Sequence, residues 1–166
     1  MTIEFTIPII PTAQMRARAR RMGNHASVYK DPKQVKNEEN LASLISKYAP
    51  AVPFSGPVAI KVDIFLPIPK SQSQWRKDAA IAGHIKHTSK PDIDNCLKEL
   101  LDVMTKTGFW DDDSQVMRIA ATKQYGAKPR WEIFVFQAIQ PQNKKQYDIM
   151  QETLQESLNL EQEDPK

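Results

Sequence analysis

Apolar and polar residues alternate along four segments of the chain, which predicts four β-strands. These segments are residues 2–10, 58–66, 114–125 and 130–137. The clearest alternation is VAIKVDIFL in the second segment, and the first segment runs into Pro11, as expected of an edge strand. A turn at the sequence GAKP joins the last two segments.

Two helices are predicted where apolar residues recur three and four positions apart. Asp31 and Pro32 form a favourable cap and first turn for the first helix. Its apolar stripe consists of Val35, Leu41, Leu44, Ile45 and Tyr48. The second helix covers residues 93–107 before a stop at Gly108, and its stripe consists of Leu97, Leu100, Leu101 and Met104.

Two long polar segments separate these elements. Residues 11–29 form a basic loop without a clear period, and residues 67–91 form a connection in which Ser73 begins a short helix. The order of strands and helices predicts an α+β fold, an α/β layer. In this fold a small mixed sheet of about four strands carries its helices on one face.

The distribution of charge divides the chain into two parts. The 166 residues suffice for one compact domain and its core. Residues 1–136 hold 20 basic and 14 acidic side chains, whereas residues 137–166 hold 3 and 6. We therefore expect a basic domain over residues 1–136, which weakly indicates a polyanionic partner, and an acidic tail over residues 137–166. The thin apolar stripe of the tail predicts a marginal helix or a disordered segment.

The remaining composition restricts the class of protein. Cys96 is the only cysteine, so no disulfide can form within the chain. The N-terminal sequence MTIEFTIPII has no basic residue ahead of its apolar run, unlike a signal peptide. No apolar run approaches the roughly 20 residues that span a bilayer. These features predict a cytoplasmic protein without a membrane segment. With 5 glycines and no glycine-rich phosphate loop, no nucleotide cofactor is expected.

Aspartates bracket the second predicted helix. Asp92 and Asp94 stand at its beginning, where a helix cap and a favourable charge at the positive end of the helix dipole would also explain them. Lys98 and Asp102 follow Asp94 at intervals of four residues, so the three share one helix face. A triplet of aspartates follows the helix at residues 111–113, where a solvated turn is the ordinary explanation.

A metal site would explain the same carboxylates. Several carboxylates within a few ångströms repel one another unless a cation neutralises them, and Mg²⁺ or Mn²⁺ prefers such oxygen ligands. If the strand over residues 114–125 brings Asp113 back to Asp92 and Asp94, the three form a metal site next to Lys98. The metal would polarise a phosphate, generate hydroxide near neutral pH and steady the leaving oxygen. Lys98 would offset the charge that builds on phosphorus.

The sequence HTSKPDIDNCLKELLDVMTKTGFWDDDSQV resembles the signature of the RusA-type Holliday junction resolvases. These proteins are endodeoxyribonucleases common in bacteria and their phages. The family pattern K-P-D-x-D-N, a following lysine, a helical L-D and D-D-x-Q-V are all present with the family's spacing. The similarity extends more loosely over residues 3–136 and does not include the tail.

The resemblance implies a homodimeric endonuclease that nicks two symmetric strands of four-way branched DNA with Mg²⁺, in recombination and repair. It assigns Asp92, Asp94 and Asp113 as the catalytic metal ligands and Lys98 as the catalytic lysine. The family usually has two aspartates where this chain has three. The downstream sequence SQV favours Asp113 over Asp112 as the matching residue.

Basic and aromatic side chains are candidates for contacts with DNA. A solvated charge run is the usual explanation of a basic segment, but a phosphodiester site elsewhere favours contacts with backbone phosphates. We expect such contacts from Arg16, Arg18, Arg20 and Lys90. Aromatic residues can stack on bases, although packing in the core is their commoner role; the candidates are Trp75, Phe109 and Trp110.

Two other functions fit parts of the pattern. A D-x-D pair also holds metal-bound nucleotide in glycosyltransferases, but such enzymes need a nucleotide-binding sheet that this short chain lacks. Alternatively, the protein is a non-catalytic branched-DNA-binding recombination accessory protein, whose aspartates only cap a helix and form a turn. Cleavage of a four-way junction that depends on Mg²⁺ would distinguish the enzyme from the accessory protein.

Overall fold

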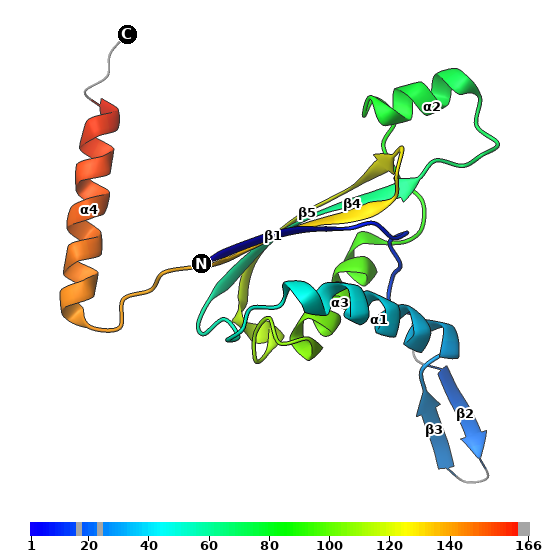
Figure 1. Ribbon diagram of the computed structural model, residues 1–166, viewed down its shortest axis with the longest axis horizontal. Coiled ribbons are helices and arrows are strands. Elements are labelled where there is room, and N and C mark those ends of the chain that lie inside the picture. Colours follow the sequence, from blue (N-terminus) through cyan, green and yellow to red (C-terminus); the bar gives the residue numbers. More distant parts are fainter. Residues whose placement is uncertain (16–17, 23–24, 163–166) are drawn as a thin grey trace.

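The sheet of the computed structural model has four strands in the order β1-β6-β4-β5 (Figure 1). The structure describes the backbone of residues 1–15, 18–22 and 25–162, and the side chains of residues 1–15 and 29–155. β4 pairs parallel with β5 and antiparallel with β6, which pairs antiparallel with β1. The strands are β1 (Thr2–Ile7), β4 (Val58–Pro67), β5 (Val116–Gly126) and β6 (Arg130–Gln137). This mixed sheet confirms the predicted α+β class.

Two helices, α1 (Pro32–Ile45) and α3 (Ile93–Lys106), lie together on one side of the sheet in Figure 1. A short 3₁₀ turn, η1 (Ser46–Tyr48), extends α1. Alternate residues of β4 and β6 face these helices and form the core with them, because successive side chains of a strand point to opposite faces. The fully buried strand residues include Val62, Ile64, Trp131, Ile133 and Val135.

The buried face of α1 differs from the predicted apolar stripe. Val35 is exposed, whereas Gln34 and Glu38 are buried with Leu41 and Ile45. The prediction was wrong at this turn because hydrogen bonds make the burial of polar groups tolerable. Burial alone would raise the pKa of Glu38, but hydrogen bonds from Lys30, Gln34 and Lys106 outweigh it and lower this pKa to about 2.

Residues 18–22 and 25–29 form two paired strands where the sequence predicted a loop. This hairpin consists of β2 (Arg18–Met22) and β3 (His25–Tyr29), paired antiparallel as a separate two-stranded sheet. Figure 1 shows the hairpin projecting beyond α1, away from the four-stranded sheet. The sequence RARRM has no alternation of polar and apolar residues, so the usual strand signal is missing.

The remaining helices lie outside the main layers. α2 (Gln74–Ile81) begins after Ser73, as predicted, within the long connection that follows β4. α4 (Lys144–Gln162) stands apart from the sheet in Figure 1, and its described side chains are exposed. No helix in the described ranges is long and apolar enough to cross a membrane. The proposed division of the chain at residue 136 stays a prediction.

Candidate active site

The start of α3 presents two carboxylates with no partner in the described part of the chain. Asp92 is the N-cap residue of α3, and its backbone oxygen accepts from Cys96 N at 3.1 Å. Its side chain makes no capping hydrogen bond. Asp94 follows in the first turn, and both side chains are exposed. The capping explanation therefore does not account for the Asp92 carboxylate, which is free to bind a ligand.

Lys98 and Asp102 lie further along α3 but do not form an ion pair with each other. Lys98 is exposed one turn beyond Asp94, and no salt bridge joins it to a carboxylate within the described ranges. Asp102 instead accepts a hydrogen bond from Gln14 Nε2 at 2.7 Å. Asp102 thus holds the segment before the hairpin, and Lys98 keeps a free ammonium group on the face of Asp94.

A lysine that the sequence analysis did not select lies at the same end of α3. Lys123 of β5 donates from Nζ to Ser89 O and Pro91 O, both at 2.8 Å. It therefore holds the peptide segment that leads into Asp92. Lys123 belongs to the helix-facing residues of β5, since it is paired with the buried Ile64. A lysine at a strand position expected to face the helices was the feature of the sequence that could have identified it.

The buried thiol of Cys96 lies close to these charged groups. Burial raises the pKa of Cys96 to about 12, and the charge of Glu99 adds to this rise. Lys123 lowers the pKa of the same thiol, whereas Asp92 and Asp94 raise it. The ammonium group of Lys123 and the carboxylates of Asp92 and Asp94 therefore act on this thiol in opposite directions. The thiol itself stays protonated at neutral pH and is not a candidate nucleophile.

A cleft of about 840 Å³ adjoins Asp92. It lies between the segment at residues 11–15, the first turns of α1 and the start of α3. Lys33 and Lys90 give its walls positive charge. The other lining residues are Pro11, Thr12, Ala13, Gln14, Met15, Asn37, Pro91, Asp92 and Asn95. Lys90, one predicted DNA contact, therefore lines the same cleft as Asp92.

The predicted arginine contacts lie mostly beyond what the structure describes. Arg16 is outside the described residues, as are the side chains of Arg18 and Arg20, whose backbone belongs to β2. The segment that leads to this hairpin is nevertheless well fixed at residues 12–15. The role of the three arginines in DNA binding stays a prediction.

A buried hydrogen-bond network fixes that segment on α1 and α3. Thr12 Oγ1 donates to Glu99 Oε2 at 2.8 Å, and Met15 N donates to Gln34 Oε1 at 2.8 Å. Gln14 N donates to Asn95 O at 2.9 Å. Burial raises the pKa of Glu99, which is fully buried. Sequence analysis did not select Glu99, although a glutamate at a helix position expected to be buried could have indicated a buried hydrogen-bond network.

The opposite end of α3 leads to the aspartate triplet, which Gln115 anchors. The side-chain oxygen of Gln115 accepts from the backbone N–H groups of Asp111 at 2.9 Å and Asp112 at 3.2 Å. Its side-chain nitrogen donates to Phe54 O at 2.8 Å and Gly56 O at 3.0 Å. These bonds tie the triplet to the loop before β4.

Local structure distinguishes Asp112 from Asp113. Asp112 caps the 3₁₀ turn η2 (Asp113–Gln115), and its carboxylate accepts from Ser114 N at 2.8 Å. This hydrogen bonding lowers the pKa of Asp112. Asp113 is exposed, and its carboxylate has no hydrogen bond within the described ranges. The structure therefore leaves Asp113, rather than Asp112, available for a ligand.

Asp113 does not reach Asp92 and Asp94 within one chain. α3 has 14 residues and so spans roughly 21 Å at 1.5 Å per residue. β5 then runs back beside it, with Lys123 near Asp92 and Asp113 just before its first residue. Over the described ranges, no group of three or more His, Cys, Asp or Glu residues is placed to hold a metal ion. The expectation that β5 returns Asp113 to the other two was wrong for a single chain.

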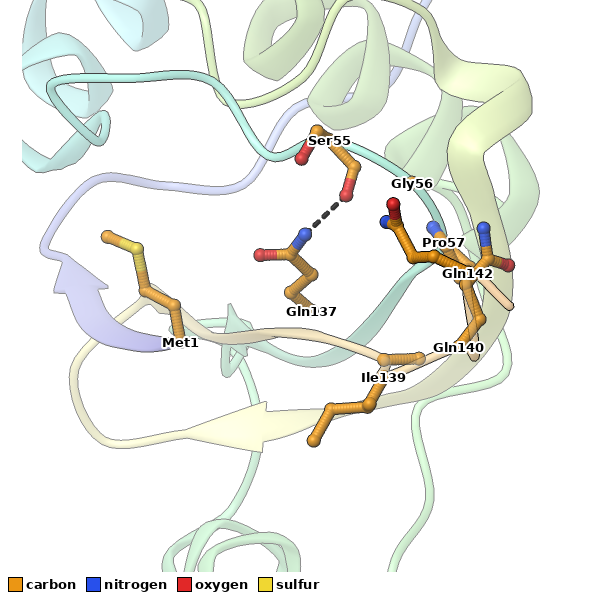
Figure 2. A pocket seen from close by; sticks show the side chains of 9 residues that line it. Met1, Ser55, Gly56, Pro57, Gln137, Ile139, Gln140 and Gln142 are labelled. Atoms are coloured by element: carbon orange, nitrogen blue, oxygen red, sulfur yellow. Dashed lines mark hydrogen bonds between the residues drawn. The ribbon is translucent and has the colours of Figure 1, made fainter. Parts of the chain in front are cut away.

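A second hollow, of about 420 Å³, lies beside the loop that Gln115 anchors. Figure 2 shows Gln137 pointing across it and donating a hydrogen bond to Ser55 O. The lining includes Met1, Gly56, Pro57, Gln140 and Gln142, and it contains no ionisable side chain. It therefore offers no charged side chain to a metal or a phosphate, unlike the cleft at Asp92.

The aromatic candidates divide between core and surface. Phe109 and Trp110 are buried, and Trp110 Nε1 donates to Thr105 Oγ1 at 2.8 Å. Packing therefore explains both. Trp75 is 65% exposed on α2, with the Arg76 guanidinium 5.3 Å from its ring centre. Only Trp75 of these three stays available to stack on a base.

Fold and site together define a small α+β protein with an exposed aspartate pair beside a lysine-lined cleft. The sequence model described as Endodeoxyribonuclease RusA matches residues 8–136, so the chain belongs to this family. The chain is 33% identical over 136 residues to the Uncharacterized protein YqaN of Bacillus subtilis, covering 80% of this chain and 94% of that protein. It is 29% identical over 132 residues to the Crossover junction endodeoxyribonuclease rusA of Lactococcus phage r1t, covering 78% of this chain and 92% of that protein.

Proposed function

We propose that this protein is an Mg²⁺-dependent endodeoxyribonuclease that resolves Holliday junctions by paired symmetric nicks in recombination and repair. Membership of the RusA family supports the reaction class. The observation that carries the proposal is the pair of exposed carboxylates at Asp92 and Asp94, beside a cleft that carries Lys33 and Lys90. The reaction would take place in the cytoplasm.

The residues at the start of α3 fit a bound magnesium ion. Mg²⁺ is commonly held by one or two carboxylates, with waters and substrate phosphate oxygens completing its coordination. Asp92 and Asp94 supply two such carboxylates without giving up any existing hydrogen bond of the described residues. When bound, the cation would contribute Lewis acidity and an activated water near neutral pH. Mn²⁺ would substitute, because it prefers the same oxygen ligands.

The chain's own residues would position the DNA and stabilise charge. Lys33 and Lys90 would contact backbone phosphates in the cleft, which fixes the strand without selecting its sequence. Lys98 lies one helical turn beyond Asp94, and its free ammonium group would offset the charge that builds on the phosphorus. Lys123 would keep Asp92 in place through the segment that precedes it.

The position of the third carboxylate supports a homodimer. Asp113 follows the far end of α3, a helix that spans roughly 21 Å at 1.5 Å per residue, and its carboxylate has no partner in the described ranges. A second copy would supply its own Asp113 to the Asp92–Asp94 pair, and would receive Asp113 in return. Two equivalent sites would then act on two strands of one junction.

A second function is favoured by one observation. A single chain shows no group of three metal-ligating acidic, histidine or cysteine residues in its described ranges. The non-catalytic alternative, a branched-DNA-binding recombination accessory protein, needs no such group. It uses the same basic cleft but leaves Asp92 and Asp94 without a role.

The two functions are separated by incubating the full-length protein with an end-labelled four-way junction in Mg²⁺. We expect paired nicks at symmetric positions, which disappear with EDTA and return on adding Mg²⁺ or Mn²⁺. A linear duplex of the same sequence is the matched control and should remain uncut. Tight junction binding without any scission in Mg²⁺ or Mn²⁺ would refute the enzyme and support the accessory protein.

A further inference from the structure

α2 presents an aromatic ring among positive charges. Trp75 is 65% exposed, whereas the other two tryptophans are buried in the core. The Arg76 guanidinium lies 5.3 Å from the centre of the Trp75 ring. Residues 70–90, which contain α2, hold 5 basic side chains and a single acidic one, Asp78. The surface around α2 is therefore cationic and carries one large, flat apolar side chain.

The chain between α2 and Asp92 is fastened to β5, so α2 has a defined place relative to the carboxylate pair. Arg76 lines a small hollow of about 40 Å³ together with Tyr125 of β5. The centres of the His87 and Tyr125 rings are 4.7 Å apart. Two residues back along β5, and roughly 7 Å away on the same face of the strand, Lys123 holds the segment directly before Asp92. Figure 1 shows α2 at the ends of β4 and β5, so its cationic surface lies at the same end of the sheet as Asp92.

We propose that Trp75 stacks on the base pair that ends a DNA arm at the branch point, and that this contact distinguishes branched from linear DNA. The inference rests on the proposed function, because it names how the substrate class is selected. Inside a linear duplex every base pair is stacked on both faces. An arm that ends at an open branch point leaves one base face uncovered, and an aromatic side chain can cover it. Stacking accepts any base, because every base has a π-face.

The surroundings of Trp75 favour DNA over a protein partner. Exposed basic side chains share this segment, and they are Lys70, Arg76 and Lys86. Basic groups that track a phosphate backbone, next to an aromatic ring on which bases stack, are the usual composition of a surface that binds unpaired DNA. A protein docking on an apolar stripe would need further large apolar side chains one helical turn from Trp75. The residues at that distance along α2 are Asp78 and Ala79.

Junction binding in EDTA tests the stacking contact separately from cleavage. Trp75→Ala in the full-length protein should weaken binding to a four-way junction by about 5- to 100-fold, and binding to a linear duplex of the same sequence much less. Trp75→Phe should recover most of the loss, because it keeps a flat ring. Ile81→Ala is the matched control and should bind like wild type, since Ile81 is 54% exposed on the same helix but is not aromatic. Equal losses in Trp75→Ala and Ile81→Ala, or on junction and duplex, would overturn the proposal.

Salt dependence separates stacking from charge. Arg76→Gln should reduce the slope of log affinity against log salt concentration by about 0.9, because it removes one phosphate contact. Trp75→Ala should leave this slope unchanged, since stacking on a base releases no counterions. A slope that falls in Trp75→Ala would show that the ring only positions Arg76, and it would overturn the stacking contact.

Photochemical cross-linking locates the base. Iodouracil placed in the pair next to the branch point should cross-link to Trp75 of the wild-type protein, whereas iodouracil in the middle of an arm should not. Cross-linking to Trp75 from the middle of an arm alone would overturn the proposal. Unchanged junction affinity in Trp75→Ala, with normal nicking by wild-type protein, would assign this surface to another partner and leave the nuclease function intact. Selective loss of junction binding in Trp75→Ala, with no nicking by wild-type protein, would refute the nuclease function while supporting the stacking contact.

Discussion

The two ends of α3 carry the same kind of side chain in different local structure. At its start, neither Asp92 nor Asp94 has a side-chain hydrogen bond within the described ranges, although Asp92 occupies the capping position. Beyond its end, Asp112 uses its carboxylate to cap η2, and Gln115 anchors the backbone of the triplet. The comparison shows that a capping position does not imply a capping bond. Carboxylates that the local fold leaves unused are those available to bind a ligand.

Removing a carboxylate at the start of α3 should have the largest effect. Even outer-shell changes at metal sites cost about 10–100-fold in affinity or activity. Asp92→Asn or Asp94→Asn should therefore lower the nicking rate at least about 100-fold, because each removes a proposed ligand. Junction binding measured in EDTA should persist or tighten, since negative charge near the DNA is lost. Nicking at the wild-type rate by either variant would remove that residue from the site.

At the other end, two neighbouring aspartates should respond differently. Asp113→Asn should lose nicking nearly as completely as the changes at Asp92 and Asp94. Asp112→Asn should keep most of its activity, because asparagine caps a turn about as well as aspartate. Rates of junction nicking under identical Mg²⁺ concentrations provide the measurement. The opposite ranking would show that Asp112 is the ligand.

Replacing Lys123, which links β5 to the segment before α3, should have a smaller effect on nicking. Lys123→Met removes the hydrogen bonds to Ser89 O and Pro91 O and leaves the segment before Asp92 less fixed. The Mg²⁺ concentration for half-maximal nicking should rise by about tenfold, as for other supporting residues of metal sites. Lys123→Arg should recover part of this loss by keeping donors at the same place. If the Mg²⁺ dependence is unchanged in Lys123→Met, Lys123 does not position the site.

The smallest effect concerns the buried middle of α3. Burial raises the pKa of Glu99 in the folded protein. Its protonated form is therefore favoured by folding. This contribution is complete at pH below its unfolded pKa, and it is lost as the pH rises through the folded pKa. Glu99→Gln should raise Tm by a few degrees near neutral pH and by less near pH 4. A stabilisation independent of pH would contradict this explanation.

Glu38, unlike Glu99, should make the folded protein less stable as the pH falls. Hydrogen bonds from Lys30 and others outweigh burial and hold its folded pKa at about 2, below its ordinary value. Its contribution to stability is therefore present above the ordinary pKa and lost as the pH falls towards 2. In wild-type protein, protonation of Glu99 opposes this loss of stability as the pH falls. In Glu99→Gln that opposing contribution is absent, so Tm measured between pH 5 and 2 should fall more steeply than in wild-type protein.

Sequence periodicity predicted the elements with an apolar face and missed those without one. The apolar residues of β4 and α3 recur at the spacing of positions that are buried in the core, so both elements could be predicted from the sequence. The sequence RARRM of β2 has no such spacing, so a loop was predicted for this segment. At Val35 the stripe was misplaced, because buried hydrogen bonds allow Gln34 and Glu38 to face inward.

The candidate site was predictable in residue type but not in arrangement. The family pattern selected Asp92, Asp94, Lys98 and Asp113 from spacing along the chain. Spacing cannot tell that a returning strand leaves Asp113 at the far end of α3. The charge of Lys123 at a helix-facing strand position was a signal in the sequence, but its contact with the segment before Asp92 was not, because it joins positions far apart in the chain.

The most direct test mixes two inactive variants, Asp94→Asn and Asp113→Asn, under conditions that allow the subunits to exchange. A site shared between copies predicts that neither variant nicks a junction alone. The mixed dimer then contains one complete site, in which Asp92 and Asp94 of one subunit meet Asp113 of the other. The mixture should therefore regain Mg²⁺-dependent nicking on one strand. If subunit exchange is demonstrated and the mixture stays inactive, the shared site is contradicted.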